Sequence, residues 1–234
     1  MPISTTYLLL CEQIADELGG RTDLLSILSG SGLALSPIKN AVQSAIAKWE
    51  REPFYMNEVY NSASPLFTTV AGQEFYTTAA NAGIASAPKI TALHILVNGN
   101  RWPLTVRTWQ YLDGISNNPA SQGQPDDWAY FAETIRLYPI PNGAYPVRAS
   151  RLQKLAALAN DGDSNIWTQD AADLIRSEAK QILALEVLHD AEMAQRMRVA
   201  IYGDPSNPRD TGYLGALKAE SARRAKSKIR PTDF

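Results

Sequence analysis

Apolar residues recur at helical spacing in two segments near the start of the chain. Residues Thr5 to Leu18 fit an amphipathic helix that Gly19-Gly20 ends. A second helix is predicted to start at Ser36-Pro37, because serine caps helices and proline suits the first helical position. Its apolar residues follow at helical spacing up to the breaker Pro53: Ile38, Val42, Ala45, Ile46 and Trp49.

The middle of the chain changes to the two-residue period of strands. Leu93, Ile95 and Val97 alternate with their neighbours and lead into Asn98-Gly99, the strongest short-range hairpin signal in the sequence. A second hairpin is predicted around residues 71–73, between strands at 67–69 and 75–76. Thr105 is expected to cap a short helix that ends at Gly114, before a loop over 116–125.

The segment 127–197 combines a third predicted hairpin with a long helix. Residues 135–137 and 147–149 alternate apolar and polar positions on either side of a turn region at 139–146. Thr168 is expected to cap one helix of about 30 residues, about 45 Å long, with Asp170 and Asp173 favouring its dipole. The helix is predicted to end near Tyr202-Gly203.

The last part of the chain follows a breaker cluster at 204–208, which predicts a hinge. Residues 213–224 are expected to form a helix and 227–234 an extended segment. Terminal segments of this kind are disordered or become ordered on a partner.

These elements predict an α+β fold. We expect a helical bundle, in which the long helix packs with the N-terminal helices, and an inserted small antiparallel β subdomain. The predicted divisions are 1–60 for the N-terminal helices, 61–158 for the β-rich insert, 159–203 for the long helix, and 204–234 for a basic C-terminal docking segment.

The net charge is −2, but its distribution is uneven. The chain beyond Pro208 is basic and the part before it is acidic. Such a tail reaches an acidic partner, lies against nucleic acid or is solvated. The cations are Arg209, Lys218, Arg223, Arg224, Lys226, Lys228 and Arg230, against Asp210, Glu220 and Asp233.

Composition narrows the class of protein. No stretch approaches the ~18 uncharged apolar residues of a membrane span, so no membrane partner is expected. The first twenty residues lack the basic region of a signal peptide. Cys11 is the only cysteine, which excludes an intrachain disulfide and predicts a small buried core residue.

Catalytic and metal-binding patterns are weak. Glu186 and His189 have the Glu-x-x-His spacing of di-iron bundles, but such sites need two of these motifs, and His94 has no partner glutamate. Residues 161–165 resemble the start of a calcium loop, yet Ile166 and Ala172 occupy its glycine and glutamate positions. Carboxylates are plentiful, so a glycosidase-type pair stays open, although none stands out. We predict no catalytic residues, metal or cofactor.

Three polar residues near the end of the long predicted helix interrupt its apolar face. Projected at helical spacing, Glu186, His189 and Asp190 fall among the apolar side chains. Burial of such groups in a monomer would be costly. They are expected either to face a sister subunit or to form a local salt bridge at the helix end.

Several short motifs, taken in order, resemble those of head-to-tail adaptor proteins of tailed bacteriophages, also called portal-adaptor or head-completion proteins. The resemblance covers about Thr5 to Met197. The matching pieces are Thr6-Tyr7-Leu8 with Leu10-Cys11, FTTVAGQEFY at 67–76, Val97-Asn98-Gly99 before Leu104, Pro125-x-x-Trp128, Ile135-Arg136-Leu137-Tyr138-Pro139-x-Pro141, and Asp163-Ser164-Asn165-x-Trp167.

The resemblance implies a non-enzymatic virion protein of the neck, made in the host cytoplasm. About twelve copies are expected to close into a ring under the portal, extend the DNA channel and dock a tail or nozzle protein. The C-terminal segment is implied to bind the portal, and its candidate contact residues are Tyr213, Lys218, Arg223, Arg224, Lys226, Lys228, Arg230 and Phe234. Two other functions remain open: a DNA-contacting module acting through the basic tail, and a virion-associated cell-wall hydrolase.

Overall fold

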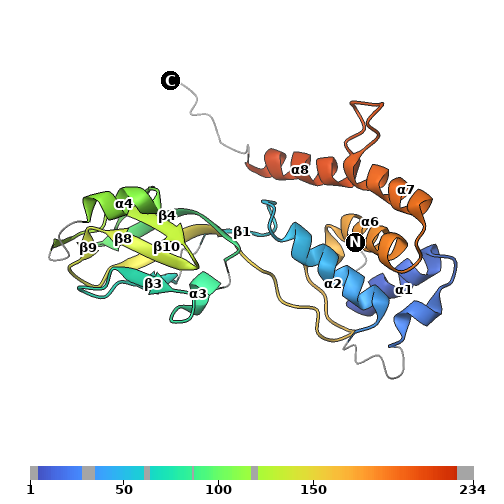
Figure 1. Cartoon of the computed structure of the whole chain (residues 1–234), viewed down its shortest axis with the longest axis horizontal. Coiled ribbons are helices and arrows are strands. Elements are labelled where there is room, and N and C mark those ends of the chain that lie inside the picture. Colours follow the sequence, from blue (N-terminus) through green and yellow to red (C-terminus); the bar gives the residue numbers. More distant parts are fainter. Residues whose placement is uncertain (1–4, 28–34, 61–63, 86, 117–120, 226–234) are drawn as a thin grey trace, which may run out of the picture. The chain divides into compact units, whose positions relative to one another are not determined.

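A computed structural model describes residues 5–27, 35–60, 64–85, 87–116 and 121–225. The chain forms two compact units (Figure 1). The helical unit comprises Met1–Met56 and Leu155–Phe234, and the β unit comprises Asn57–Lys154. The fold is therefore mixed α+β, as predicted.

Side-chain caps set the start of the first helices of the helical unit. Thr6 Oγ1 accepts a hydrogen bond from Leu9 N, and Ser36 Oγ accepts one from Lys39 N. Both predicted N-terminal helices are confirmed. The helices of this unit are α1 (Tyr7–Glu17), the 3-10 turn η1 (Thr22–Leu25), α2 (Pro37–Trp49), α5 (Ile166–Gln169), α6 (Ala172–Glu186), α7 (Ala191–Tyr202) and α8 (Gly212–Ala225).

Helices α1, α2 and α6 share one hydrophobic core. Cys11 is fully buried in it, which confirms its predicted role as a small core residue. Trp167 is also fully buried, and its ring meets that of Phe54 edge-on at 5.9 Å. Other members of this core include Leu10, Ile14, Ile38, Val42, Ile175, Leu183 and Ile201.

The prediction of one long helix from Thr168 is wrong. Asn165, rather than Thr168, caps α5, and Thr168 completes its capping box. Helix α6 ends at Glu186, and His189 adopts a left-handed backbone with φ +52°. Asp190 then caps α7 by accepting a hydrogen bond from Met193 N at 2.9 Å. Aspartate is a poor helix former but a favourable N-cap residue. The helix therefore ends before Asp190, and a new helix begins after it.

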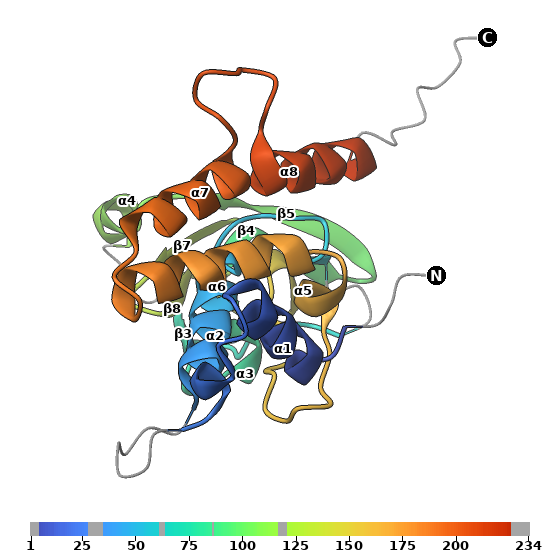
Figure 2. The ribbon, with the colours of Figure 1, turned by 90° about the vertical axis from the view of Figure 1, so that its right-hand side faces the viewer.

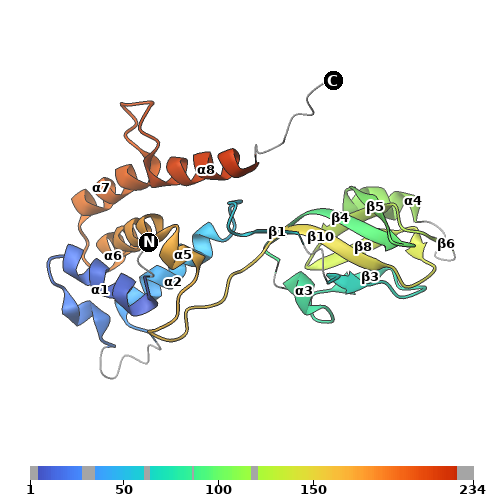
Figure 3. The same ribbon diagram turned by 180° about the vertical axis from the view of Figure 1, so that it is seen from behind.

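Helices α7 and α8 follow each other nearly end to end, and the loop between them projects away from their junction (Figures 1, 2 and 3). Two glycines close the base of this loop. A Cβ on Gly212 would come within 2.5 Å of Gly203 N, and both residues have positive φ. The predicted end near Gly203 and the predicted helix at 213–224 are both confirmed.

The β unit is built around a strongly curled sheet. Its strand order is β1-β10-β4-β5-β7-β8-β3, with β2 also paired to β10 and β6–β9 forming a separate pair. Pairing is antiparallel except for β5–β7 and β6–β9. The elements are β1 (Glu58–Tyr60), β2 (Phe67–Thr68), β3 (Phe75–Thr77), α3 (Ala82–Ala85), β4 (Lys89–Val97), β5 (Asn100–Val106), α4 (Trp109–Ile115), β6 (Gln122–Gly123), β7 (Asp127–Phe131), β8 (Thr134–Tyr138), β9 (Ile140–Pro141) and β10 (Pro146–Leu152).

Two hairpins of the β unit have two-residue turns, and the sequence predicted only one of them. Asn98 (φ +52°) and Gly99 (φ +80°) join β4 to β5, which confirms the predicted hairpin. A second such turn, Ala132 (φ +46°) and Glu133 (φ +57°), joins β7 to β8 and was not predicted, because neither residue favours positive φ.

Three local predictions in this unit are wrong. Residues 135–137 and 147–149 do not pair, because β8 bonds β7 and β3 while β10 bonds β4. The turn at 71–73 exists, but β2 and β3 pair with other strands. Thr108, not Thr105, caps α4, since Thr105 belongs to β5. Strands β2, β3 and β10 pair with strands distant in sequence, and Thr105 stays in β5 because it pairs with Asp127 of β7.

The core of the β unit lies on one face of the sheet. Its fully buried members include Leu93, Ile95, Ile135, Leu137 and Val147. The two ends of the unit meet in neighbouring strands. Glu58 lies opposite Leu152, and Gln153 N donates to Asn57 O at 2.9 Å.

Candidate interaction surfaces

The predicted docking residues of the tail divide into two groups. Tyr213, Lys218, Arg223 and Arg224 lie on α8 and are exposed. Lys226, Lys228, Arg230 and Phe234 lie outside the described residues.

Helix α8 is anchored to the helical unit, which sequence reasoning did not predict. Its Leu217 is buried in the helical core, and Ser221 Oγ accepts a hydrogen bond from Tyr55 N at 3.2 Å. The Arg224 guanidinium lies 3.7 Å from the centroid of the Tyr55 ring. The Tyr55 hydroxyl in turn donates to Asp170 at 2.6 Å. These contacts hold the basic end of α8 against the rest of the helical unit.

Glu220 partly neutralises this basic end. Arg223 and Arg224 both pair with its carboxylate, at 2.8 and 2.7 Å, and these hydrogen bonds lower the pKa of Glu220 to about 2. Lys218 makes no ion pair with any described residue.

Glu186, His189 and Asp190 lie at the turn between α6 and α7, where all three are exposed. The helical projection that placed them on an apolar face is wrong, because the helix breaks between them. None of the three forms an ion pair with another described residue. Two exposed apolar side chains, Leu185 and Val187, accompany them.

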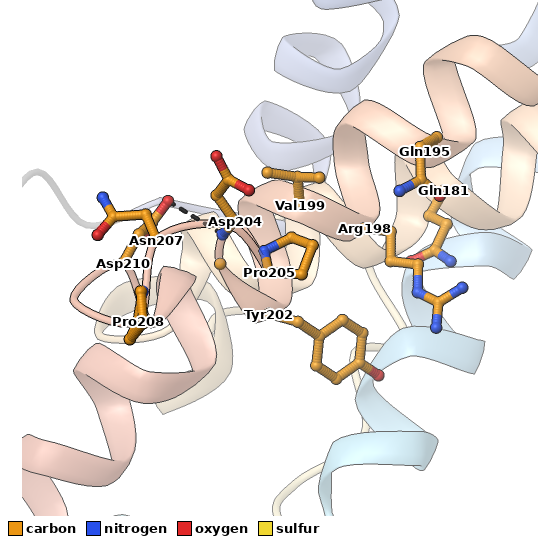
Figure 4. Close-up of a pocket in the computed structure, with 11 residues that line it drawn as sticks. Gln181, Gln195, Arg198, Val199, Tyr202, Asp204, Pro205, Asn207, Pro208 and Asp210 are labelled. Atoms are coloured by element: carbon orange, nitrogen blue, oxygen red, sulfur yellow. Dashed lines mark hydrogen bonds between the residues drawn. The ribbon is translucent and has the colours of Figure 1, made fainter.

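A hollow of about 890 Å³ lies between α7 and the loop that precedes α8, and polar and apolar side chains line it (Figure 4). Gln181, Gln195 and Arg198 gather at one end of it. The carboxylates of Asp204 and Asp210 bind loop backbone instead: Ser206 N donates to Asp204 at 2.8 Å, and Asp204 N donates to Asp210 at 3.2 Å. Both carboxylates thus hold the loop rather than form an acid–base pair.

No group of three His, Cys, Asp or Glu residues within the described part of the chain could hold a metal ion. Among the described helices, none is both long and apolar enough to cross a membrane.

The β unit carries an exposed aromatic patch that sequence reasoning missed. The patch consists of Phe75, Trp109 and Phe131. Trp109, from α4, lies between the other two rings, at 5.9 Å from Phe75 and 5.6 Å from Phe131. Phe75 is 44% exposed and Phe131 62% exposed. Exposed aromatic clusters on a rigid sheet are typical of protein-binding hot spots.

The buried side chain of Arg136 contacts two of the rings in this patch. The Arg136 guanidinium lies 5.4 Å from the ring centroids of both Phe75 and Trp109. Its Nε donates to Glu74 at 2.5 Å and its Nη1 donates to Asp113. Burial lowers the pKa of Arg136, but these two carboxylates outweigh it and raise the pKa. The arginine stays charged, and it orders the rings before any partner arrives.

The described residues thus carry an exposed surface feature in each of two units, the basic helix α8 and the aromatic patch, and no group of three metal-ligating residues. A family model described as SU10 adaptor protein matches residues 5–230. The chain belongs to the SU10 adaptor protein family, whose members are bacteriophage structural proteins of the head–tail adaptor type. No curated protein matches the chain.

Proposed function

We propose that this protein is a head-to-tail adaptor that forms a ring of about twelve copies under the portal. In this proposal the ring extends the DNA channel and docks a tail or nozzle protein, and the helical unit acts as the ring-forming bundle. Membership of the adaptor family and the order of the matching motifs support the proposal.

One observation carries the proposal beyond the family. An adaptor must bind two different partners, and each unit of this chain has its own core and its own exposed binding feature. The helical unit presents the anchored basic helix α8, and the β unit presents the aromatic patch. We assign the first to the portal and the second to the next tail component.

The portal contact is tested by mixing the purified chain with its cognate portal ring and weighing the product by native mass spectrometry. We expect about a dozen bound copies, absent for the chain alone. Deletion of residues 226–234 should abolish binding, since it removes three cations but leaves the anchoring contacts of Leu217, Ser221 and Arg224. Normal docking of this truncated chain would refute the role of the tail.

The tail contact is tested by a matched pair of substitutions on one strand. Phe131 and Tyr130 are adjacent on β7, 62% and 43% exposed, and point to opposite faces of the sheet. Phe131→Ala should weaken binding of the next tail component to portal-bound adaptor by at least 30-fold, as removal of a hot spot of about 2 kcal/mol does. Tyr130→Ala should leave this binding unchanged. Equal losses would contradict the assignment.

The contact between copies is proposed to include Glu186, His189 and Asp190, together with Leu185 and Val187. Glu186 is exposed and forms no ion pair with a described residue, so reversal of its charge breaks none of the ion pairs described above. Glu186→Lys should lower the number of copies bound per portal, whereas Glu12→Lys, an exposed charge reversal on α1, should not. A full complement of Glu186→Lys copies would remove this residue from the interface.

A further inference from the structure

The face of the sheet opposite the core carries a cluster of basic and aromatic side chains. Arg148 on β10 lies opposite His94 on β4. Tyr60 on β1 lies opposite Ser150, two residues from Arg148, and Arg101 on β5 lies opposite Leu96, two residues from His94. Because side chains two residues apart share a face, all four belong to one surface.

Ring and guanidinium contacts join Tyr60, His94 and Arg101, and the strand register places Arg148 beside His94. The Tyr60 and His94 rings meet edge-on, with centroids 6.2 Å apart. Arg101 Cζ lies 4.9 Å from the centroid of the Tyr60 ring. The Tyr60 ring of the edge strand β1 thus contacts side chains of both β4 and β5. Stacking on a ring leaves the edge of a guanidinium, with its N–H donors, open to a further partner.

Polar atoms in this cluster lack partners. Tyr60 Oη, His94 Nδ1 and Arg148 Nε are buried and have no hydrogen-bond partner among the described residues. A buried polar atom without a partner is costly, so three in one cluster indicate a missing ligand.

Charge identifies the ligand as an anion. Neither Arg101 nor Arg148 forms an ion pair with a described residue, whereas Arg107 and Arg136 of the same unit pair with Asp127 and Glu74. The nearest carboxylate along β1, that of Glu58, is exposed and pairs with neither arginine.

We propose that Tyr60, His94, Arg101 and Arg148 form a binding site for a phosphate group. Two guanidinium groups, a phenol hydroxyl and an imidazole N–H are hydrogen-bond donors that suit phosphate oxygens. The phosphate comes either from a nucleic-acid backbone or from free phosphate. The inference concerns the isolated chain and does not depend on ring assembly.

Titration with inorganic phosphate tests the site directly. The chain has two histidines, so the C2–H proton resonance of His94 can be followed by NMR with His189, far away in sequence on the α6–α7 turn, as an internal reference. Phosphate should shift the His94 resonance and leave that of His189 in place. The shift should disappear when Arg101 and Arg148 are both replaced by alanine. Equal shifts of both histidines would mean general anion binding and would overturn the proposal.

A fluorescent 20-base-pair duplex separates the two phosphate sources. Binding of the full chain is measured by anisotropy over a range of salt concentrations. If the site holds a nucleic-acid backbone, Arg101→Ala with Arg148→Ala should weaken binding more than tenfold and lower the log–log salt slope by about 2. Tyr60→Phe should weaken binding about fivefold, as expected for one hydrogen bond.

A charge-matched control isolates the site from overall charge. Arg51→Ala with Arg198→Ala removes two exposed arginines of the helical unit that form no ion pair with a described residue, and should change duplex binding less than twofold. A phosphate shift at His94 without a difference between the two double variants on DNA assigns the site to free phosphate. No response of His94 to phosphate and no difference on DNA would overturn the proposal.

Discussion

Replacement of Lys48 by methionine tests what holds α2, α6 and α7 together. Lys48 Nζ donates to Glu178 Oε1 at 2.6 Å, and its ammonium also lies over the rings of Trp49 and Tyr202, at 4.8 and 5.9 Å. Glu178 is only 4% exposed, and its second oxygen has no hydrogen-bond partner among the described residues. Lys48→Met therefore leaves a buried carboxylate without the one cation that pairs with it among the described residues.

The structure sets the size of the expected effect. Breaking a fully buried ion pair costs about 3–5 kcal/mol. The Lys48 side chain is 44% exposed, so water screens the pair, and we expect Lys48→Met to lower the free energy of unfolding by about 2 kcal/mol. The double variant Lys48→Met with Glu178→Leu removes both charges and should lie within about 1 kcal/mol of the native chain.

Pulse labelling of Cys11 in urea measures the free energy of unfolding of the helical unit, which contains Lys48 and Glu178. Cys11 is the only cysteine and is buried in the helical core, so its labelling reports the helical unit and not the β unit. The pair Arg196–Glu192, exposed at both ends, gives the control: Arg196→Met should cost less than about 0.5 kcal/mol. The reasoning is refuted if the double variant is as unstable as Lys48→Met alone.

Three further predictions follow from local features. Burial raises the pKa of both Cys11 and Tyr7 to about 12, above their ordinary values of 9.0 and 10.0. The stability that these neutral groups contribute is therefore present below pH 9 and is lost as the pH rises towards 12. The urea midpoint of unfolding should fall across this pH range, and a flat profile would contradict this. Asp190→Ala removes the cap of α7 and should cost about 1 kcal/mol by Cys11 labelling, whereas Asp190→Asn should cost little. Gly99→Ala strains a turn residue with φ +80° and should destabilise the β4–β5 hairpin by about 1 kcal/mol in hydrogen exchange; unchanged exchange would show that the turn relaxes.

Local signals in the sequence predicted those elements whose determinants lie within a few residues. Ser36-Pro37 starts α2 because cap and first turn are adjacent, and Asn98-Gly99 joins β4 to β5 because both residues accept positive φ. The break at Asp190 was equally local, but the apolar period of α6 seemed to continue through it. A helical projection cannot reveal an N-cap residue that falls on the apolar face of the projected helix, as Asp190 does.

The interaction surfaces could not be predicted in the same way. Phe75 and Trp109 are 34 residues apart in sequence; the pairing of β3 with β8 and of β8 with β7 places Phe75 near Phe131, and helix α4 adds Trp109 to both rings. The anchoring of Arg224 on Tyr55 likewise depends on the tertiary packing of α8. The sequence indicated a basic tail, but not that part of its charge is neutralised by Glu220 or stacked on a ring.

The meeting of the two ends of the β unit makes that unit an exchangeable cassette. The chain enters it at Asn57 and leaves it after Lys154, and Gln153 N donates to Asn57 O next to the paired strands β1 and β10, which lie about 5 Å apart. An insertion with adjoining ends can be lengthened, replaced or excised while the host core keeps its own contacts. Exchange of the β unit at these two points would leave the helical core around Cys11 and Trp167 unchanged.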